Sequence, residues 1–165
     1  MSKVLCVYYS RTGHTRRTMR DFADQLDAEL VELRDTVQRS GWKGWLRCGM
    51  DAMRRGTCPL RPYTTEYPLS EYDLVILGTP VWAGRCSSVM RGFLKRHGKE
   101  LERVAYVVLQ NGEKKQRAVY AQMDLYVAKP FVAAVSLKDG SVGYPFWHDR
   151  FLQQVREYLA KREES

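Results

Sequence analysis

The sequence predicts an α/β protein with a doubly wound, five-stranded parallel sheet in a three-layer α/β/α arrangement. Short apolar runs alternate along the chain with segments of helical periodicity, which is the order of elements that produces such a sheet. The stretch YDLVILG at 72–78 is almost continuously apolar, as expected for a parallel strand buried on both faces. Crossovers between parallel strands are right-handed, so the helices divide between the two faces of the sheet.

Each element is predicted from its own pattern. The first helical segment shows the periodicity most clearly, because Met19, Phe22 and Leu26 recur at three- and four-residue spacing. Ser87 or Ser88 is a suitable N-cap for the second helix. The predicted strands span residues 3–9, 29–33, 72–78, 103–109 and 131–137, and the predicted helices span 14–26, 87–97, 116–128 and 146–162.

Length and composition indicate one domain, residues 1–165, because a chain of this size can bury a single substantial core. No apolar run approaches the roughly 18 residues that a membrane helix needs, and the first residues lack the pattern of a secretory signal. We therefore expect a cytoplasmic protein. The four cysteines and three histidines are scattered without metal-ligand spacing, which predicts no metal site.

The net charge of +8 suits acidic partners or anionic ligands. No zinc-knuckle spacing or RNP-like aromatic motif accompanies it, so we expect no specific nucleic-acid binding. Half of the charge comes from residues 35–62, where Trp42, Trp45, Met50 and Met53 recur at helical spacing among basic residues. This pattern indicates either a sheet-covering helix with a basic outer face or a docking surface for an acidic partner or anionic lipid.

The stretch SRTGHT at 10–15 connects the first predicted strand to the first predicted helix. Ser10, Thr12 and Thr15 place hydroxyl groups at a helix N-terminus, where free backbone N–H groups and the helix dipole favour an anion. Gly13 can adopt a positive φ or let the backbone approach a ligand closely. The pattern predicts a phosphate site, although an ordinary N-cap by Thr12 or Thr15 would use the same residues.

Spacing excludes two other phosphate chemistries. A nucleotide triphosphatase loop requires a Lys next to its second Gly, and no Lys follows Gly13. A cysteine phosphatase requires its nucleophile inside the phosphate loop, whereas Cys6 lies in the middle of the first predicted strand. We expect Cys6 to be a thiol of the hydrophobic core.

Two further loops leave the carboxyl ends of predicted strands, at 78–85 (GTPVWAGR) and 110–115 (QNGEKK). Trp82 in the first of them could stack on a planar ring or simply cover the end of the sheet. The pair Asn111-Gly112 in the second is on its own a turn signal. In an open parallel sheet the ligand lies beyond the carboxyl ends of the strands, so we expect the three loops to meet around one ligand.

The sequence resembles the flavodoxin-like family of FMN-binding proteins. The resemblance rests on YYSRTGHT at 8–15, ILGTPVWAGRCSSVMRGFL at 76–94 and VVLQNG at 107–112, and it extends over nearly all of the chain. It implies the strand order 2-1-3-4-5, with FMN bound between the first and third strands, which is the placement established for flavodoxin itself.

By that resemblance, the first loop holds the FMN phosphate and the other two loops border the isoalloxazine ring. Trp82 would stack on the ring, and a carbonyl near Ala83 or Gly84 would accept a hydrogen bond from N5 of the reduced flavin. The resemblance assigns no catalytic residue. The implied cofactor-binding residues are Ser10, Thr12, Gly13, His14, Thr15, Pro80, Val81, Trp82, Ala83, Gly84, Asn111 and Gly112.

The function implied by the resemblance is electron transfer through FMN. An NAD(P)H-dependent reductase of quinones or other small acceptors is an alternative, and a flavin-free binding or regulatory module on the same fold is another. No G-x-G-x-x-G occurs, yet nicotinamide can stack directly on a flavin, so this absence weighs little against the reductase. The implied partners are FMN and either a redox protein, expected to be acidic because this chain is basic, or a small electron acceptor.

Overall fold

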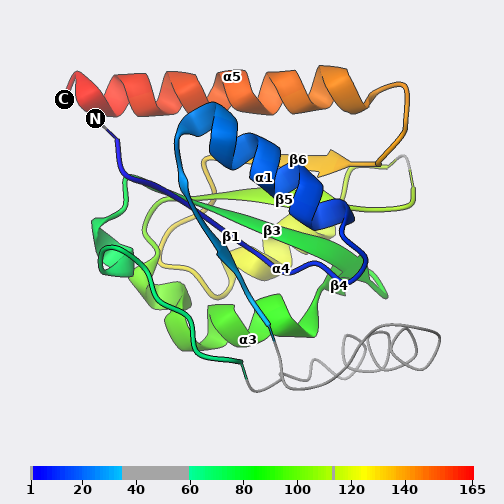
Figure 1. Ribbon diagram of the computed structural model, residues 1–165, viewed down its shortest axis with the longest axis horizontal. Helices are drawn as coiled ribbons and strands as arrows, with labels where there is room; N and C mark the ends of the chain where they lie inside the picture. The colour runs from blue at the N-terminus through cyan, green and yellow to red at the C-terminus, as the bar shows by residue number, and fades with distance from the viewer. Residues whose placement is uncertain (1, 35–59, 113) are drawn as a thin grey trace.

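The computed structural model describes residues 2–34, 60–112 and 114–165 (Figure 1). The strands are β1 (Val4–Tyr8), β2 (Glu29–Glu32), β3 (Leu74–Trp82), β4 (Arg85–Cys86), β5 (Val104–Leu109) and β6 (Ala133–Leu137). The described helices are α1 (His14–Leu26), α3 (Ser88–His97), α4 (Arg117–Asp124) and α5 (Tyr144–Glu163). Short 3-10 turns occur at Leu69–Glu71 and Gly98–Glu100.

The sheet has five parallel strands in the order β2-β1-β3-β5-β6, and β4 pairs antiparallel with the end of β3. This arrangement confirms the predicted doubly wound order, because β4 is a short addition outside the parallel series. Tyr8 at the end of β1 lies opposite Gly78 of β3. The loops that leave these two strands therefore start side by side at the carboxyl edge of the sheet.

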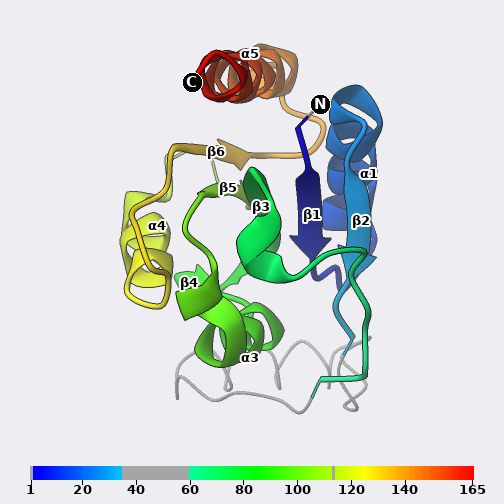
Figure 2. The same ribbon diagram turned by 90° about the vertical axis from the view of Figure 1, so that its left-hand side faces the viewer.

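Helices cover both faces of the sheet, with α1 and α5 on one side and α3 and α4 on the other (Figure 2). Phe22 of α1 and Phe151 of α5 are buried in the first layer, and Phe93 of α3 and Met123 of α4 in the second. Full burial of such a side chain contributes about 1.5–3 kcal/mol relative to exposure. The two apolar layers fix the sheet between them and so hold its carboxyl edge in place.

Cys6 is a core thiol, as predicted. Its side chain is fully buried in the layer formed with α1 and α5, and burial raises the pKa of the thiol to about 12. The thiol is therefore protonated at neutral pH and is not a nucleophile.

Several element bounds differ from the prediction. The third strand runs past residue 78 to Trp82, because it pairs with β5 as far as Pro80 and then with β4. The helix predicted over 116–128 ends at Asp124, whose carboxylate accepts hydrogen bonds from the Tyr106 hydroxyl and the Phe131 N–H. These bonds turn the chain back toward β6, which begins at Ala133 instead of 131. Helix α5 begins at Tyr144, two residues earlier than predicted.

Most of the basic segment 35–62 lies outside the described residues, so both interpretations of its Trp and Met pattern stay predictions. Among the described residues that border this region, the Arg61 N–H donates a 2.7 Å hydrogen bond to the Arg34 carbonyl. In the described part of the chain, no helix combines the length and hydropathy that a bilayer span requires.

Candidate functional site

A cavity of about 230 Å³ lies at the carboxyl edge of the sheet, among the loops that follow β1, β3, β5 and β6. In Figure 1 this edge is on the right, where the chain enters α1. The cavity is lined by Ser10, Arg11, Thr12, His14, Thr15, Pro80, Val81, Trp82, Leu109, Gln110, Asn111, Lys138 and Asp139.

The structure brings most of the predicted site residues together. The glycines at 13, 84 and 112 and the alanine at 83 do not line the cavity; they lie within two residues of lining residues in the same three loops. The predicted residues that do line it are Ser10, Thr12, His14, Thr15, Pro80, Val81, Trp82 and Asn111.

The first loop is shaped by Gly13, which takes the left-handed φ of 101° as the N-cap residue of α1. The Gly13 N–H donates a 2.9 Å hydrogen bond to Ser10 Oγ, which closes the loop on itself. No described side chain caps α1, so the alternative interpretation, an N-cap by Thr12 or Thr15, is wrong. Thr15 is instead buried within the first turn of the helix, and Thr12 is exposed. An uncapped helix N-terminus offers free N–H groups and a partial positive charge.

The second loop is a tight hairpin between β3 and β4. Trp82 pairs with Arg85, and the two residues between them have left-handed backbones, with φ of 50° at Ala83 and 74° at Gly84. A two-residue connection with both φ values positive matches the twist of a β-hairpin. The hairpin fixes the position of Trp82 at the cavity.

Trp82 serves both the core and the cavity. Its side chain is only 8% exposed and meets the Tyr9 ring edge-on, with 5.4 Å between the ring centroids and 87° between the planes. It also lines the cavity wall. The core interpretation of Trp82 is therefore correct in part, and stacking on a ligand ring stays a prediction.

The loop after β6 contributes charged residues that the sequence analysis missed. Asp139 Oδ2 lies 2.6 Å from His14 Nδ1 and accepts a 2.7 Å hydrogen bond from Arg17 Nη2. Lys138 also lines the cavity. The rule that ligands lie beyond the carboxyl ends of parallel strands, applied to the fifth predicted strand as well, would have found both residues.

A second charged cluster adjoins the first loop. Glu32, at the end of β2, accepts hydrogen bonds from Arg16 and from Arg34, the latter at 3.0 Å. Burial raises the pKa of Glu32, but the two guanidinium groups outweigh burial and hold the pKa below its ordinary value. A neighbouring cavity of about 210 Å³ is lined by these three residues together with Ser10 and Arg61, so this region keeps an excess of positive charge.

No protein-family model matches the sequence. Solved structures do resemble it over nearly its whole length. One is a flavoprotein from Lactobacillus acidophilus in complex with FMN, at 19% identity and a TM-score of 0.67, covering 89% of this chain and 99% of that one. Another is a flavodoxin, a WrbA-like protein from Agrobacterium tumefaciens, at 16% identity and a TM-score of 0.59, covering 96% and 99%.

A third similar structure is an NADH:FMN oxidoreductase in its apo form, at 11% identity and a TM-score of 0.55, covering 96% of this chain and 88% of that one. At such identities the similarity defines the fold and not the activity. This chain therefore has the flavodoxin-like fold, with its cavity at the place where the winding of the sheet reverses.

Proposed function

We propose that this protein binds FMN non-covalently in the cavity at the carboxyl edge and transfers electrons through it in the cytoplasm. The observation that carries the proposal is the convergence of three features on one cavity. These are the uncapped N-terminus of α1, the hairpin that holds Trp82 and the loop at Asn111.

The chemistry of the first loop fits a terminal phosphate. The N-terminus of α1 supplies N–H donors and a partial positive charge, and Ser10 and Thr12 add hydroxyl groups. Arg11 and Lys138 add full positive charges to the same cavity, against a single described carboxylate, that of Asp139. A phosphate dianion is the ligand group that this donor set favours.

The other two loops fit a flat, partly polar ring system. Trp82 and Val81 offer an apolar wall from β3, while Gln110 and Asn111 offer amide groups from the loop after β5. When bound, FMN supplies the redox chemistry, and the protein contributes orientation and electrostatics. The residues present therefore suit both ends of FMN.

Electron transfer with an acidic partner protein is the leading role within this proposal, because the chain carries a net charge of +8. A reductase that takes electrons from NAD(P)H and passes them to quinones or other small acceptors is the second candidate. The arginine-lined cavity at the end of β2 favours it, since this cavity shares Ser10 with the candidate FMN cavity and suits the phosphates of a nicotinamide nucleotide. The similar fold of an NADH:FMN oxidoreductase adds support.

Anaerobic mixing of the FMN-loaded protein with NADH or NADPH separates the two roles. A reductase loses its flavin absorbance within seconds after addition of one of the nucleotides. A carrier keeps its absorbance with both nucleotides and loses it only when a second redox protein or a chemical reductant is added. Failure to load FMN at all would contradict both roles and leave the flavin-free binding module.

A further inference from the structure

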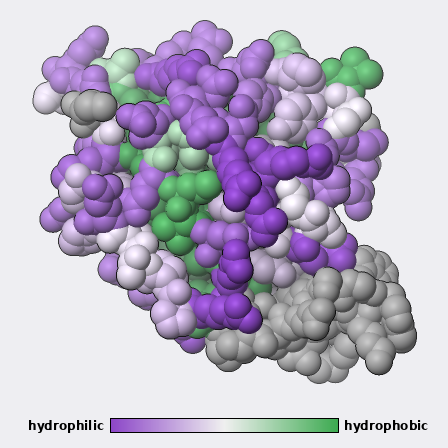
Figure 3. Space-filling model, in the orientation of Figure 1, coloured by the Kyte–Doolittle hydropathy of each residue, from purple (hydrophilic) through white to green (hydrophobic). Residues whose placement is uncertain are grey.

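The start of α5 carries an exposed aromatic and basic surface outside the candidate FMN cavity. Val142 is 100% exposed, Phe146 is 58% exposed and Trp147 is 45% exposed. We call these three residues, together with Arg150 of α5 and Lys115 of the loop before α4, the aromatic–basic patch. Figure 3 shows hydrophobic surface among hydrophilic residues at the upper right, where Figure 1 places the beginning of α5.

The aromatic side chains of the patch project together. The rings of Phe146 and Trp147 meet edge-on, with 5.0 Å between centroids and 82° between planes. The Arg150 guanidinium lies 5.9 Å from the centroid of the Trp147 ring. Two large apolar rings therefore lie next to a cation and remain exposed at the protein surface.

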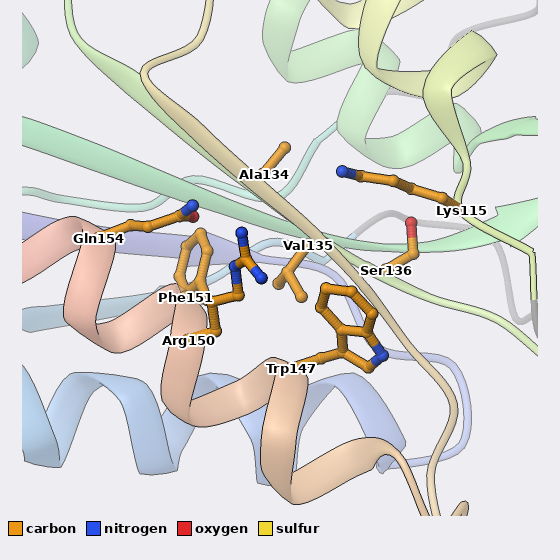
Figure 4. Close-up of a pocket in the computed structure, with 8 residues that line it drawn as sticks. All are labelled: Lys115, Ala134, Val135, Ser136, Trp147, Arg150, Phe151 and Gln154. Atoms are coloured by element: carbon orange, nitrogen blue, oxygen red, sulfur yellow. The ribbon is translucent and has the colours of Figure 1, made fainter.

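A cavity of about 220 Å³ opens beneath the patch, between α5 and the edge strand β6 (Figure 4). Lys115 enters it from the loop before α4, and Arg150 enters from α5. Val135 and Phe151 supply its apolar lining, and no carboxylate is among its described lining residues. The open cavity is therefore lined by two cations that come from two different elements.

Among the described residues, the charge around the patch is mixed but mostly positive. Within the described part of the chain, neither Lys115 nor Arg150 forms an ion pair. Lys114 and Arg117, which flank Lys115 in sequence, are also exposed. Two acidic residues of α5, Asp149 and Glu157, line a further cavity together with Phe146 and Arg150, and Asp149 Oδ1 lies 2.9 Å from His148 Nδ1. The patch is therefore cationic as well as apolar.

We propose that the aromatic–basic patch docks this protein on the surface of an anionic lipid bilayer. Val142, Phe146 and Trp147 would enter the interfacial region, and a lipid phosphate would lie between Lys115 and Arg150. Exposed Trp and Phe beside Lys and Arg are the composition of interfacial membrane anchors. An anionic bilayer fits both parts of the patch, because its interfacial region takes up exposed apolar side chains such as Val142 and its surface attracts basic residues.

Docking through this patch brings the candidate FMN cavity close to the lipid surface. The loop of Lys115 also carries Asn111, and the loop of Val142 also carries Asp139; both Asn111 and Asp139 line that cavity. A lipid-bound protein would thus present its FMN site toward the bilayer.

The test is co-sedimentation of the FMN-loaded full chain with vesicles of phosphatidylcholine alone or mixed with phosphatidylglycerol. Binding is expected only to the mixed vesicles, and it should weaken as salt is raised. Arg150→Gln should lower the vesicle partition coefficient about fivefold, which corresponds to the loss of about 1 kcal/mol for one basic residue at an anionic surface. The double substitution of Phe146 and Trp147 by Ser should lower it further.

Arg156→Gln is the matched control, because it removes the same charge from the same helix. Arg156 donates to the Gln25 carbonyl at 3.2 Å, away from the patch, so this variant should change binding much less than Arg150→Gln. FMN binding by every variant, measured separately, checks that each one is folded and keeps the proposed function apart from this test.

Three results would overturn the proposal. The first is the absence of preferential binding to the mixed vesicles. The second is an equal effect of Arg150→Gln and Arg156→Gln, which would mean that the net charge of the protein, and not the patch, drives binding. The third is binding to polyglutamate without binding to vesicles, which would assign the patch to an acidic macromolecule instead.

Discussion

Asp139 and His14 are in contact, with 2.6 Å between Oδ2 and Nδ1, and this contact ties the loop after β6 to the start of α1. Arg17 binds the same carboxylate at 2.7 Å. The side chains of His14, Asp139 and Arg17 are 52%, 43% and 68% exposed, so these contacts contribute little stability. The carboxylate nevertheless lines the cavity that we assign to the FMN phosphate.

Asp139→Asn should therefore tighten FMN binding. The substitution removes a negative charge that repels the phosphate, and at an effective dielectric constant between those of protein and water this repulsion is worth about 1 kcal/mol, or about fivefold in affinity. Titration of the apoprotein with FMN, followed by flavin fluorescence at low salt, measures the change. Weaker binding would mean that positioning of His14 and Arg17 outweighs the repulsion.

Gly13→Ala should weaken FMN binding and destabilise the fold. The left-handed φ of 101° at Gly13 is strained for any residue with a Cβ, at a cost of about 1–2 kcal/mol. Gly143→Ala is the matched control, because Gly143 is also the N-cap residue of a helix, α5, but has a φ of −79°, and a Cβ there would make an ordinary 3.5 Å contact with Trp147. Urea denaturation and FMN titration of both variants check the difference, and equal effects would contradict the role of Gly13.

The redox potential of bound FMN should depend on the basic residues near the first two loops of the site that are not paired with a carboxylate. Four arginines lie in or next to the first two loops, namely Arg11, Arg16, Arg17 and Arg85. Of these, Arg16 is paired with Glu32 and Arg17 with Asp139. Arg11 lines the cavity. One charge about 8 Å from the ring, at an effective dielectric constant near 20, is worth on the order of 2 kcal/mol before screening, or roughly 90 mV for a one-electron couple.

Arg11→Gln should therefore lower the potential at which bound FMN accepts its second electron. Because salt screens the charge, the expected shift is on the order of tens of millivolts. A spectroelectrochemical titration of wild type and variant measures this shift, with Arg156→Gln as a distant control. An unchanged or raised potential in the Arg11 variant would show that its charge does not act on the ring.

Stability should depend on pH through Glu32. Its pKa is held below the ordinary value by Arg16 and Arg34, although burial acts in the other direction. A carboxylate with a lower pKa in the folded state stabilises the protein above its unfolded pKa of about 4.3, and this contribution is lost as pH falls through the folded pKa. Glu32→Gln should thus be less stable than wild type at neutral pH.

The difference between Glu32→Gln and wild type should shrink in acid. Denaturant unfolding at neutral pH and at pH below about 4 measures it. A difference that stays constant between the two conditions would mean that Glu32 acts by packing and not by charge.

Much of the fold was predictable because apolar periodicity reports local burial. The bounds 14–26 of α1 were predicted to the residue, since Met19 and Phe22 mark its buried face. Strand β4 was not predictable, because its two residues pair only through the turn at Ala83, and alanine seldom adopts a positive φ.

The candidate site was predictable where its residues stand in one loop and not where they meet across the fold. Ser10, Thr12 and Gly13 form a local pattern at the start of a helix. The contact of Asp139 with His14 joins residues 125 positions apart, and no local sequence pattern predicts it. The general rule for parallel sheets indicates the edge where such contacts form, without naming the residues.

The most direct test of the FMN assignment is a fluorescence titration of the apoprotein with FMN and, in parallel, with riboflavin. The account predicts saturable quenching of FMN fluorescence at one FMN per chain, and binding of riboflavin at least tenfold weaker, equal to about 1.4 kcal/mol, because riboflavin lacks the phosphate that the first loop binds. Absence of saturable FMN binding, or equal affinity for riboflavin, would contradict it.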